Sequence, residues 1–154
     1  TRQQLGYWKD SEALFRHALD VTRDNYPAHL NLGIALGEKG QLDEAIREFQ
    51  QALRLKPDAA NARITLGIAL GQSGQTDEAI RQFEETLRRE PDNAHAHNNL
   101  GIALNRKGRT GEAVQHFREA LRLKPDYTTA RENLDAVLAT RADSPQPPGA
   151  STKP

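Results

Sequence analysis

The sequence LGIAL occurs three times, at Leu32–Leu36, Leu66–Leu70 and Leu100–Leu104, always 34 residues apart. Around these stretches, about twenty of every 34 positions agree between the unit 26–59 and each of the units 60–93 and 94–127. Such agreement at a fixed period indicates a tandem repeat in which each copy is one supersecondary unit. One unit of this size cannot bury its apolar side chains alone, so we expect the three copies to stack on one another.

Each unit is predicted to form two helices joined by a tight turn. In the first unit, residues 30–36 place apolar side chains at helical spacing, and Gly40 can adopt the left-handed conformation that ends a helix. Residues 45–53, AIREFQQAL, are apolar on one face and charged on the other, and Pro57 ends this second helix. The same signals recur in the later units at Gly74, Gly108, Pro91 and Pro125.

Further residues predict how the helices begin and how they pack. Thr76 and Thr110 stand where a hydroxyl can cap the second helix, while the first unit has Leu42 there. The Asp that follows each proline is a turn former that can cap the next helix. Phe49 and its counterparts Phe83 and Phe117 are predicted to fill the gap between paired helices, which small residues such as Gly33 allow to approach closely.

The repeated residues resemble the tetratricopeptide repeat family. The resemblance is carried by Leu, Gly, Ala, Phe, Ala and Pro at the family's intervals, which in the first unit are Leu32, Gly33, Ala45, Phe49, Ala52 and Pro57. It covers about residues 8–140, although Thr86 replaces the second Ala in the middle unit. The resemblance implies an all-α fold, a right-handed superhelical solenoid of antiparallel helix pairs whose first helices line the concave surface.

At the N-terminal end, residues 8–25 match a second helix that has no first helix of its own, because Phe15 corresponds to Phe49. Residues 1–7 are interpreted as a junction. The segment 2–26 resembles the junction before the repeat tail of bacterial multi-pass membrane proteins related to protein O-mannosyltransferases. Since the sequence contains no Met and opens at Thr1, we expect it to be part of a longer protein.

At the C-terminal end, residues 128–141 match a first helix, with Asp135 where the other units have Gly. This segment is polar enough to face water, as a helix that caps a solenoid must be. Residues 142–154 are rich in Pro, Ser and Gly and are predicted to form a disordered tail.

The resemblance implies that the concave groove is lined by fixed positions of each first helix. The sixth position gives Asn31, Thr65, Asn99 and Asn133, a row that resembles the asparagine ladder of O-linked N-acetylglucosamine transferases. The ninth position gives Ile34, Ile68 and Ile102, and the fifth gives Leu30, Ile64 and Asn98. His95 and Asn105 complete the predicted groove. An apolar stripe at this spacing also fits ordinary core packing, and the sequence leaves both readings open.

Two further observations concern what the groove could hold. Gly37 and Gly71 cost roughly 1 kcal/mol each relative to Ala inside a helix, which indicates room left for a neighbouring helix or for a guest. Cochaperone members of the family hold a C-terminal carboxylate with Lys, Arg and Asn. The matching residues here, Leu30, Ile34, Thr65, His95 and Asn99, include neither Lys nor Arg, so a carboxylate clamp of this kind is excluded.

Composition excludes several classes of function. The 21 basic residues equal the 21 acidic ones, which argues against nucleic acid as a partner. Cys is absent, the five His lack the spacing of metal ligands, and the repeated acids have no base or nucleophile beside them. No apolar run approaches the roughly 20 residues of a membrane helix. We therefore expect no enzyme activity, no cofactor, no metal and no membrane insertion of this chain.

The sequence thus predicts a non-catalytic scaffold that binds a peptide or helical segment of a partner protein in the concave groove. One alternative is an assembly module that self-associates or docks in a larger complex through the ends of the solenoid. Another is the extracytoplasmic repeat tail of a membrane glycosyltransferase-like parent. The compartment stays open between extracytoplasmic and cytoplasmic.

Overall fold

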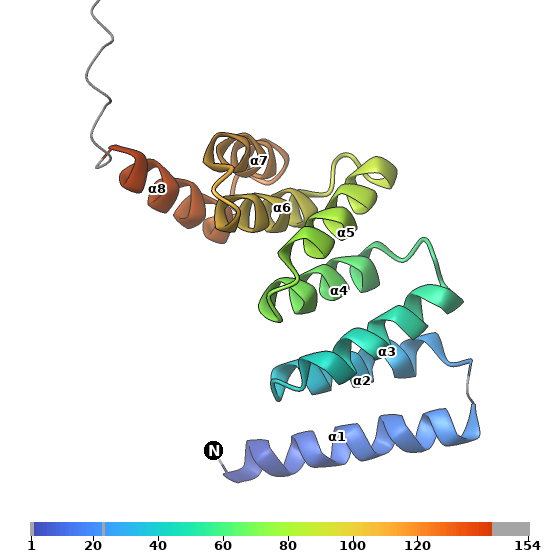
Figure 1. Ribbon diagram of the computed structural model, residues 1–154. Helices are drawn as coiled ribbons and strands as arrows, with labels where there is room; N and C mark the ends of the chain where they lie inside the picture. The colour runs from blue at the N-terminus through green and yellow to red at the C-terminus, as the bar shows by residue number, and fades with distance from the viewer. Residues whose placement is uncertain (1, 23, 143–154) are drawn as a thin grey trace, which may run out of the picture.

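The computed structural model describes residues 2–22 and 24–142, and within them the chain forms eight α-helices and no strand (Figure 1). The helices are α1 (Arg2–Val21), α2 (Tyr26–Glu38), α3 (Leu42–Leu55), α4 (Ala60–Gln72), α5 (Thr76–Arg89), α6 (Ala94–Arg106), α7 (Thr110–Leu123) and α8 (Thr128–Ala142). The predicted all-α class is confirmed.

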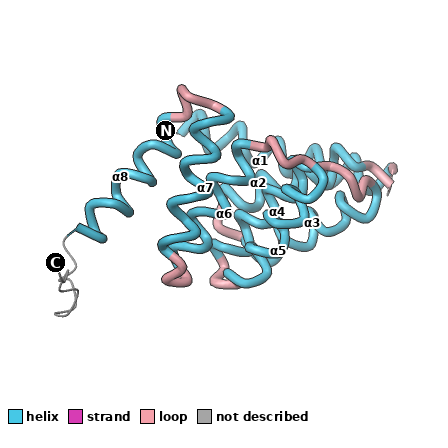
Figure 2. Tube along the Cα trace, turned by 90° about the horizontal axis from the view of Figure 1, so that it is seen from above, coloured by secondary structure: helices cyan, strands magenta, loops and turns pink. Residues whose placement is uncertain are grey.

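The helices stack in chain order. α2 packs against α3, α4 against α5 and α6 against α7, and each second helix also packs against the first helix of the next pair. The first helices α2, α4, α6 and α8 contact one another in turn. As Figures 1 and 2 show, the stack winds into a superhelical solenoid, with α1 at one end and α8 at the other. This is the predicted architecture.

A phenylalanine and a glycine hold each helix pair together. Phe49 is 3% exposed, and a Cβ added to Gly33 would lie 2.6 Å from its Cε1 atom. The corresponding distances in the second and third units are 2.5 and 2.7 Å. Because no side chain heavier than hydrogen fits at these glycines, the paired helices approach closely enough for the ring to be enclosed. The predicted packing role of the phenylalanines is confirmed.

The predicted glycines end the first helices. Gly40, Gly74 and Gly108 have positive φ angles of 76°, 86° and 76°. The Gly40 N–H donates to the carbonyl of Gly37 (3.0 Å), and the Gln41 N–H donates to the carbonyl of Leu36 (2.9 Å). These two bonds form the Schellman motif, which satisfies carbonyls that the helix leaves unpaired. The second helices end at Leu55, Arg89 and Leu123, each two residues before the predicted proline.

The predicted caps of the second helices are wrong. Thr76 and Thr110 are the first residues inside α5 and α7, and the N-caps are Gln75 and Arg109, which make no side-chain cap bond. The Schellman motif uses the residue directly after the glycine, so the helix begins one residue earlier than a hydroxyl cap would require. Arg109 instead reaches the side chain of Glu112, with 2.7 Å separating its Nε from Oε1.

The aspartates after the prolines do not cap the next helices either. α6 is capped by Asn93, whose side-chain oxygen accepts a hydrogen bond from the Ala96 N–H at 2.9 Å. α2 has the same arrangement at Asn25, whereas the N-cap of α4 is Ala59, which offers no side-chain bond. The turn after each proline is therefore one residue longer than the prediction allowed.

Both ends of the stack differ from the predicted boundaries. α1 begins at Arg2, so the helix continues through most of the expected junction 1–7. The repeat comparison missed this extension because it detects only similarity to other units, while Arg, Gln and Leu near the start are good helix formers. α8 includes Ala142, which the prediction placed in the tail. The remaining tail, 143–154, lies outside the described residues.

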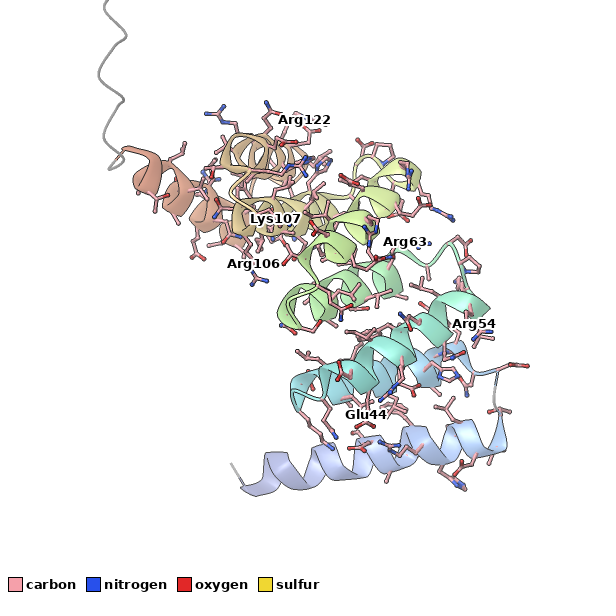
Figure 3. All side chains as sticks on the ribbon, viewed as in Figure 1. Glu44, Arg54, Arg63, Arg106, Lys107 and Arg122 are labelled. Atoms are coloured by element: carbon pink, nitrogen blue, oxygen red, sulfur yellow. The ribbon has the colours of Figure 1, made fainter. Side chains whose placement is uncertain are left out.

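Charged side chains cover the outer helices. Arg122 projects outward from α7 and pairs with Glu119 three residues earlier, with 2.7 Å between Arg122 Nη2 and Glu119 Oε1 (Figure 3). Arg81 pairs with Glu78 in the same way on α5. Pairs at this helical spacing stabilise a solvated face by a few tenths of a kcal/mol each. The outer surface of α5 and α7 therefore carries charges of both signs.

Candidate functional site

Three adjoining hollows lie along the face formed by the first helices, and Ile68 of α4 lines all of them. The first hollow, of about 230 Å³, lies between α2 and α4. The second, of about 150 Å³, lies between α4 and α6 over α5. The third, of about 530 Å³, extends from α4 and α6 to Tyr127 and to Thr129 of α8. We call these three hollows together the groove.

The third hollow contains most of the predicted site residues, which are Ile64, Thr65, Ile68, His95, Asn98, Asn99 and Ile102. Its lining combines side-chain amides, hydroxyls and isoleucines. Among the described residues that line it, none is Asp, Glu, Lys or Arg. A surface of this composition can bond a peptide backbone and bury aliphatic side chains, but it offers no counter-ion to a charged ligand.

The isoleucines differ in how far they reach the surface. Ile34 and Ile68 are each 37% exposed, whereas Ile102 packs partly against the core. Ile34 lines the first hollow. Ile64 and Asn98 are buried and form the floor of the third hollow rather than its rim.

The row of amides does not form a continuous ladder. The Asn99 side-chain amide donates to the carbonyl of His95 at 2.9 Å, within its own helix. The Thr65 hydroxyl likewise donates to helix carbonyls, including that of Asn61 at 3.0 Å. Asn133 donates to the side-chain oxygen of the buried Asn98 at 3.0 Å. At three of the four predicted positions, Thr65, Asn99 and Asn133, the side chain therefore already donates a hydrogen bond to another group of the protein.

Four predicted residues lie outside the three hollows. Leu30 is half-buried against the core, and Asn31 is exposed. Asn105 is exposed near the end of α6, where its side-chain oxygen accepts from the Thr110 hydroxyl at 3.4 Å. Asn133 is the fourth. The structure thus brings eight of the twelve predicted residues together in the hollows and leaves these four outside them.

Tyr127 is a groove residue that the sequence did not predict. Its hydroxyl lies 3.0 Å from His95 Nδ1, and the two rings are 5.0 Å apart at an angle of 60°. Burial raises the pKa of the Tyr127 hydroxyl, which therefore stays protonated at neutral pH. The corresponding residues of the other units are Ala59 and Asn93, so no repeated pattern identified this position.

The two helix glycines have different neighbours. Gly71 lines the second hollow, and the Arg106 guanidinium of α6 donates to its carbonyl at 3.1 Å. Gly37 lines the first hollow beside Ile34, and a Cβ there would meet only the Cβ of Ala45, at 3.9 Å. Both glycines therefore border a hollow, and only Gly71 also contacts a side chain of α6.

Histidines join paired helices outside the groove. His97 Nδ1 lies 3.0 Å from His116 Nδ1, and His97 Nε2 lies 2.9 Å from the carbonyl of Pro91. If both rings are neutral, both contacts are hydrogen bonds, with His116 donating to His97 and His97 donating to Pro91. Burial lowers the pKa of His116, and the nearby His97 lowers it further. Within residues 2–22 and 24–142, no group of three or more side chains is arranged to hold a metal ion.

Within the described residues, no helix combines the length and the apolar character needed to cross a membrane.

Comparisons with known proteins identify the repeat. Models of the tetratricopeptide repeat family match residues 27–91 and 64–128, which together make up about two thirds of the chain. Neither match reaches the segment 2–26, so its resemblance to mannosyltransferase-related proteins stays a prediction. No curated protein sequence matches the chain at a significant level.

Solved structures with the same fold include MamA, YrrB and Spaghetti. MamA superimposes with a TM-score of 0.80 at 18% identity, covering 92% of this chain and 82% of MamA. YrrB, described as a TPR protein with an unusual peptide-binding site, has a TM-score of 0.76 at 27% identity, covering 82% of this chain and 66% of YrrB. The first TPR of Spaghetti, solved with an HSP90 peptide, has a TM-score of 0.72 at 17% identity, covering 77% of this chain and 94% of that one. The helix pairs, the family matches and these likenesses agree: the chain belongs to the tetratricopeptide repeat family.

Proposed function

We propose that this chain is a non-catalytic scaffold that binds an extended segment of a partner protein along the groove. The observation that carries the proposal is the position of Ile68, a large apolar side chain that is 37% exposed at the point where all three hollows meet. An exposed apolar side chain in a concave surface is typical of a site that another molecule covers.

The lining of the third hollow favours an uncharged segment with aliphatic side chains, while Glu38 and Arg106 border the first and second hollows. Ile68 and Ile34 offer apolar contact, while amide and hydroxyl groups around the third hollow suit the backbone of an extended peptide. YrrB, at 27% identity, is described as having a peptide-binding site, which supports a peptide as the ligand of this chain as well.

A displayed library of random 12-residue peptides tests this proposal. Peptides selected on the unaltered chain should bind at least tenfold more weakly to the Ile68→Glu variant, because the carboxylate removes an apolar contact and must be desolvated when the peptide binds. The Asn99→Ala variant should lose affinity to a smaller extent, because its oxygen can accept from a peptide N–H.

The matched control is Leu55→Glu. Leu55 lies at the end of α3, away from the groove, and is 39% exposed, nearly the same as Ile68. Circular dichroism should show unchanged helicity in all three variants. If the selected peptides bind the folded Ile68→Glu variant as tightly as the Leu55→Glu variant, the groove is not the binding site.

A further inference from the structure

The floor of the third hollow contains a buried amide. Asn98 is 2% exposed, and Thr86 is the only other polar side chain that is buried within the described residues. The Thr86 hydroxyl donates to the carbonyl of Gln82 at 2.9 Å and is therefore satisfied. In the two preceding units, the residues that correspond to Asn98 are Leu30 and Ile64, which offer no side-chain hydrogen bond. The third unit thus has an amide at a position where the other two units have an aliphatic residue.

Only half of the Asn98 amide is used inside the protein. Its oxygen accepts a hydrogen bond from Asn133 Nδ2 of α8 at 3.0 Å, whereas its own nitrogen, Nδ2, donates to no other described residue. Every fully covered side-chain nitrogen or oxygen among the described residues has a partner, so Asn98 Nδ2 is not fully covered. Since the third hollow is the one part of the groove that Asn98 lines, the unused donor faces this hollow. A buried donor that is left open to a hollow calls for a functional explanation.

Asn133 sets which end of the Asn98 amide faces the hollow. Because Asn133 donates, the oxygen of Asn98 is directed to α8 and the nitrogen is left for the hollow. A reversed Asn98 amide would place two NH2 groups against each other and lose this hydrogen bond. Asn133 lies outside the three hollows, so its role toward a ligand is to position Asn98.

Two other side chains that line the third hollow can accept hydrogen bonds. Asn99 Nδ2 donates to the carbonyl of His95 at 2.9 Å, and the side-chain oxygen of Asn99 accepts from no other described residue. The Thr65 hydroxyl donates to carbonyls of its own helix, including that of Ala62 at 3.0 Å, and its oxygen can still accept. The hollow thus combines one donor at its floor with acceptors elsewhere in its lining.

This arrangement disfavours most kinds of ligand side chain. A carboxylate can accept from Asn98, but it would lose its hydration in a hollow whose described lining contains neither Lys nor Arg. An ammonium or guanidinium group has donors only and cannot accept from Asn98. An aliphatic side chain that covers Asn98 Nδ2 leaves this donor without water and without a partner, which is unfavourable.

A carboxamide meets all of these requirements. Its oxygen can accept from Asn98, its NH2 group can donate to Thr65 or Asn99, and it carries no net charge. The CH2 groups of a glutamine or asparagine side chain can pack on the isoleucines that line the same hollow. The volume of about 530 Å³ falls in the range of pockets that hold drug-sized ligands, so a single side chain fits.

We propose that the third hollow is a specificity pocket for a carboxamide side chain, glutamine or asparagine, of the bound segment. Asn98 donates to the oxygen of this side chain, and Asn133 is the positioning residue that directs the donor into the hollow. The inference rests on the proposed function, because it names the side chain that the groove selects from its partner.

Peptides selected from the random 12-residue library on the unaltered chain test the proposal. These peptides should carry Gln or Asn at one common position. Replacing that residue with Leu should weaken binding at least tenfold in a fluorescence anisotropy titration, because Asn98 then loses its acceptor. Replacement with Glu or Lys should weaken binding at least as much. This comparison needs no protein variant, so it decides the question even where a variant fails to fold.

Variants of the protein locate the pocket. Asn98→Leu copies Leu30 and should reverse the preference, so that the leucine peptide binds at least as tightly as the carboxamide peptide. Asn133→Leu should lower the ratio of the two affinities at least threefold and leave the affinity for the leucine peptide unchanged. The matched control is Gln51→Leu, which replaces an exposed amide of α3 outside the three hollows and should keep the ratio of the unaltered chain.

The outcomes separate this proposal from the one on which it rests. Selected peptides that lose affinity for the Ile68→Glu variant but share no carboxamide position would overturn the specificity pocket and leave the proposed function intact. An affinity ratio that Asn98→Leu does not change would do the same. An empty selection, or peptides that bind the Ile68→Glu variant without loss, would overturn the proposed function and the pocket with it.

Discussion

Two glycines of α2, four residues apart on one side of the helix, should respond to alanine in opposite ways. At Gly33 the new Cβ would lie 2.6 and 2.7 Å from Cε1 and Cδ1 of Phe49, whose ring is enclosed by the core. Overpacking of this kind costs typically ~1–3 kcal/mol. The gain in helix propensity from glycine to alanine is only about 1 kcal/mol. Since the ring has little room to move, we expect Gly33→Ala to lower the free energy of unfolding by about 1–2 kcal/mol.

At Gly37 the same substitution should stabilise the protein. The new methyl group would meet only the Cβ of Ala45, at an ordinary contact distance of 3.9 Å. The helix propensity gain is then unopposed and amounts to roughly 0.5–1 kcal/mol. The two variants carry the same chemical change in the same helix, so each is the control for the other.

Urea unfolding followed by circular dichroism measures both effects, and a thermal scan should separate the midpoints by roughly 5–10 °C for a chain of this size. A third variant tests the cause. In a Phe49→Leu background the clash is absent, so Gly33→Ala should there cost clearly less than in the unaltered chain. Equal stability of Gly33→Ala and Gly37→Ala, or an undiminished cost in the Phe49→Leu background, would refute the close-contact explanation.

Three further predictions concern caps, turns and pH. Asn93→Ala should destabilise the chain by about 1 kcal/mol in urea unfolding, because α6 loses its only side-chain cap bond. Gly74→Ala should lower the free energy of unfolding by roughly 1–2 kcal/mol in the same assay, because φ is +86° there. No atom lies within 4 Å of the added methyl group, so the left-handed backbone is the cause of this loss. The lowered pKa of His116 means that the folded state binds protons less readily than the unfolded state. Stability should therefore be constant above about pH 6.5 and fall as the pH drops through that value toward the lowered pKa of His116. The double variant His97→Arg and His116→Gln, which copies the pair Arg63 and Gln82, should lose this part of the pH dependence in urea midpoints measured from pH 8 to pH 5.

The repeat made most of the fold predictable. Each signal was present three times, so the glycine turns, the proline ends and the Phe–Gly contacts could be recognised from spacing alone. The predicted N-caps Thr76 and Thr110 were wrong, because a hydroxyl near the start of a helix does not by itself fix the residue at which the helix begins. The backbone bonds of the preceding Schellman turn decide where the helix begins, and those bonds leave no sequence mark beyond the glycine.

The site was predictable only in part. The sequence left two readings open for the isoleucine stripe, and Ile34 and Ile68 fit the exposed one, because each is 37% exposed and lines a hollow. Whether Ile64 and Asn98 line a rim or a floor depends on how far α4, α6 and α8 are rotated against one another, which periodicity does not give. Tyr127 was missed because it belongs to a turn and occurs in one unit only.

The pattern of helix contacts has a consequence for how the chain opens and closes. Within residues 2–22 and 24–142, each helix touches only its neighbours in sequence and, for first helices, the next first helix. No contact in this part of the chain ties α1 to α8, so opening at one end need not disturb the other. Backbone amides of α4 and α5 should exchange with deuterium most slowly, and those of the terminal helices fastest. Ile68 belongs to that slowest segment, so a ligand held there would sit on the part of the molecule that fluctuates least.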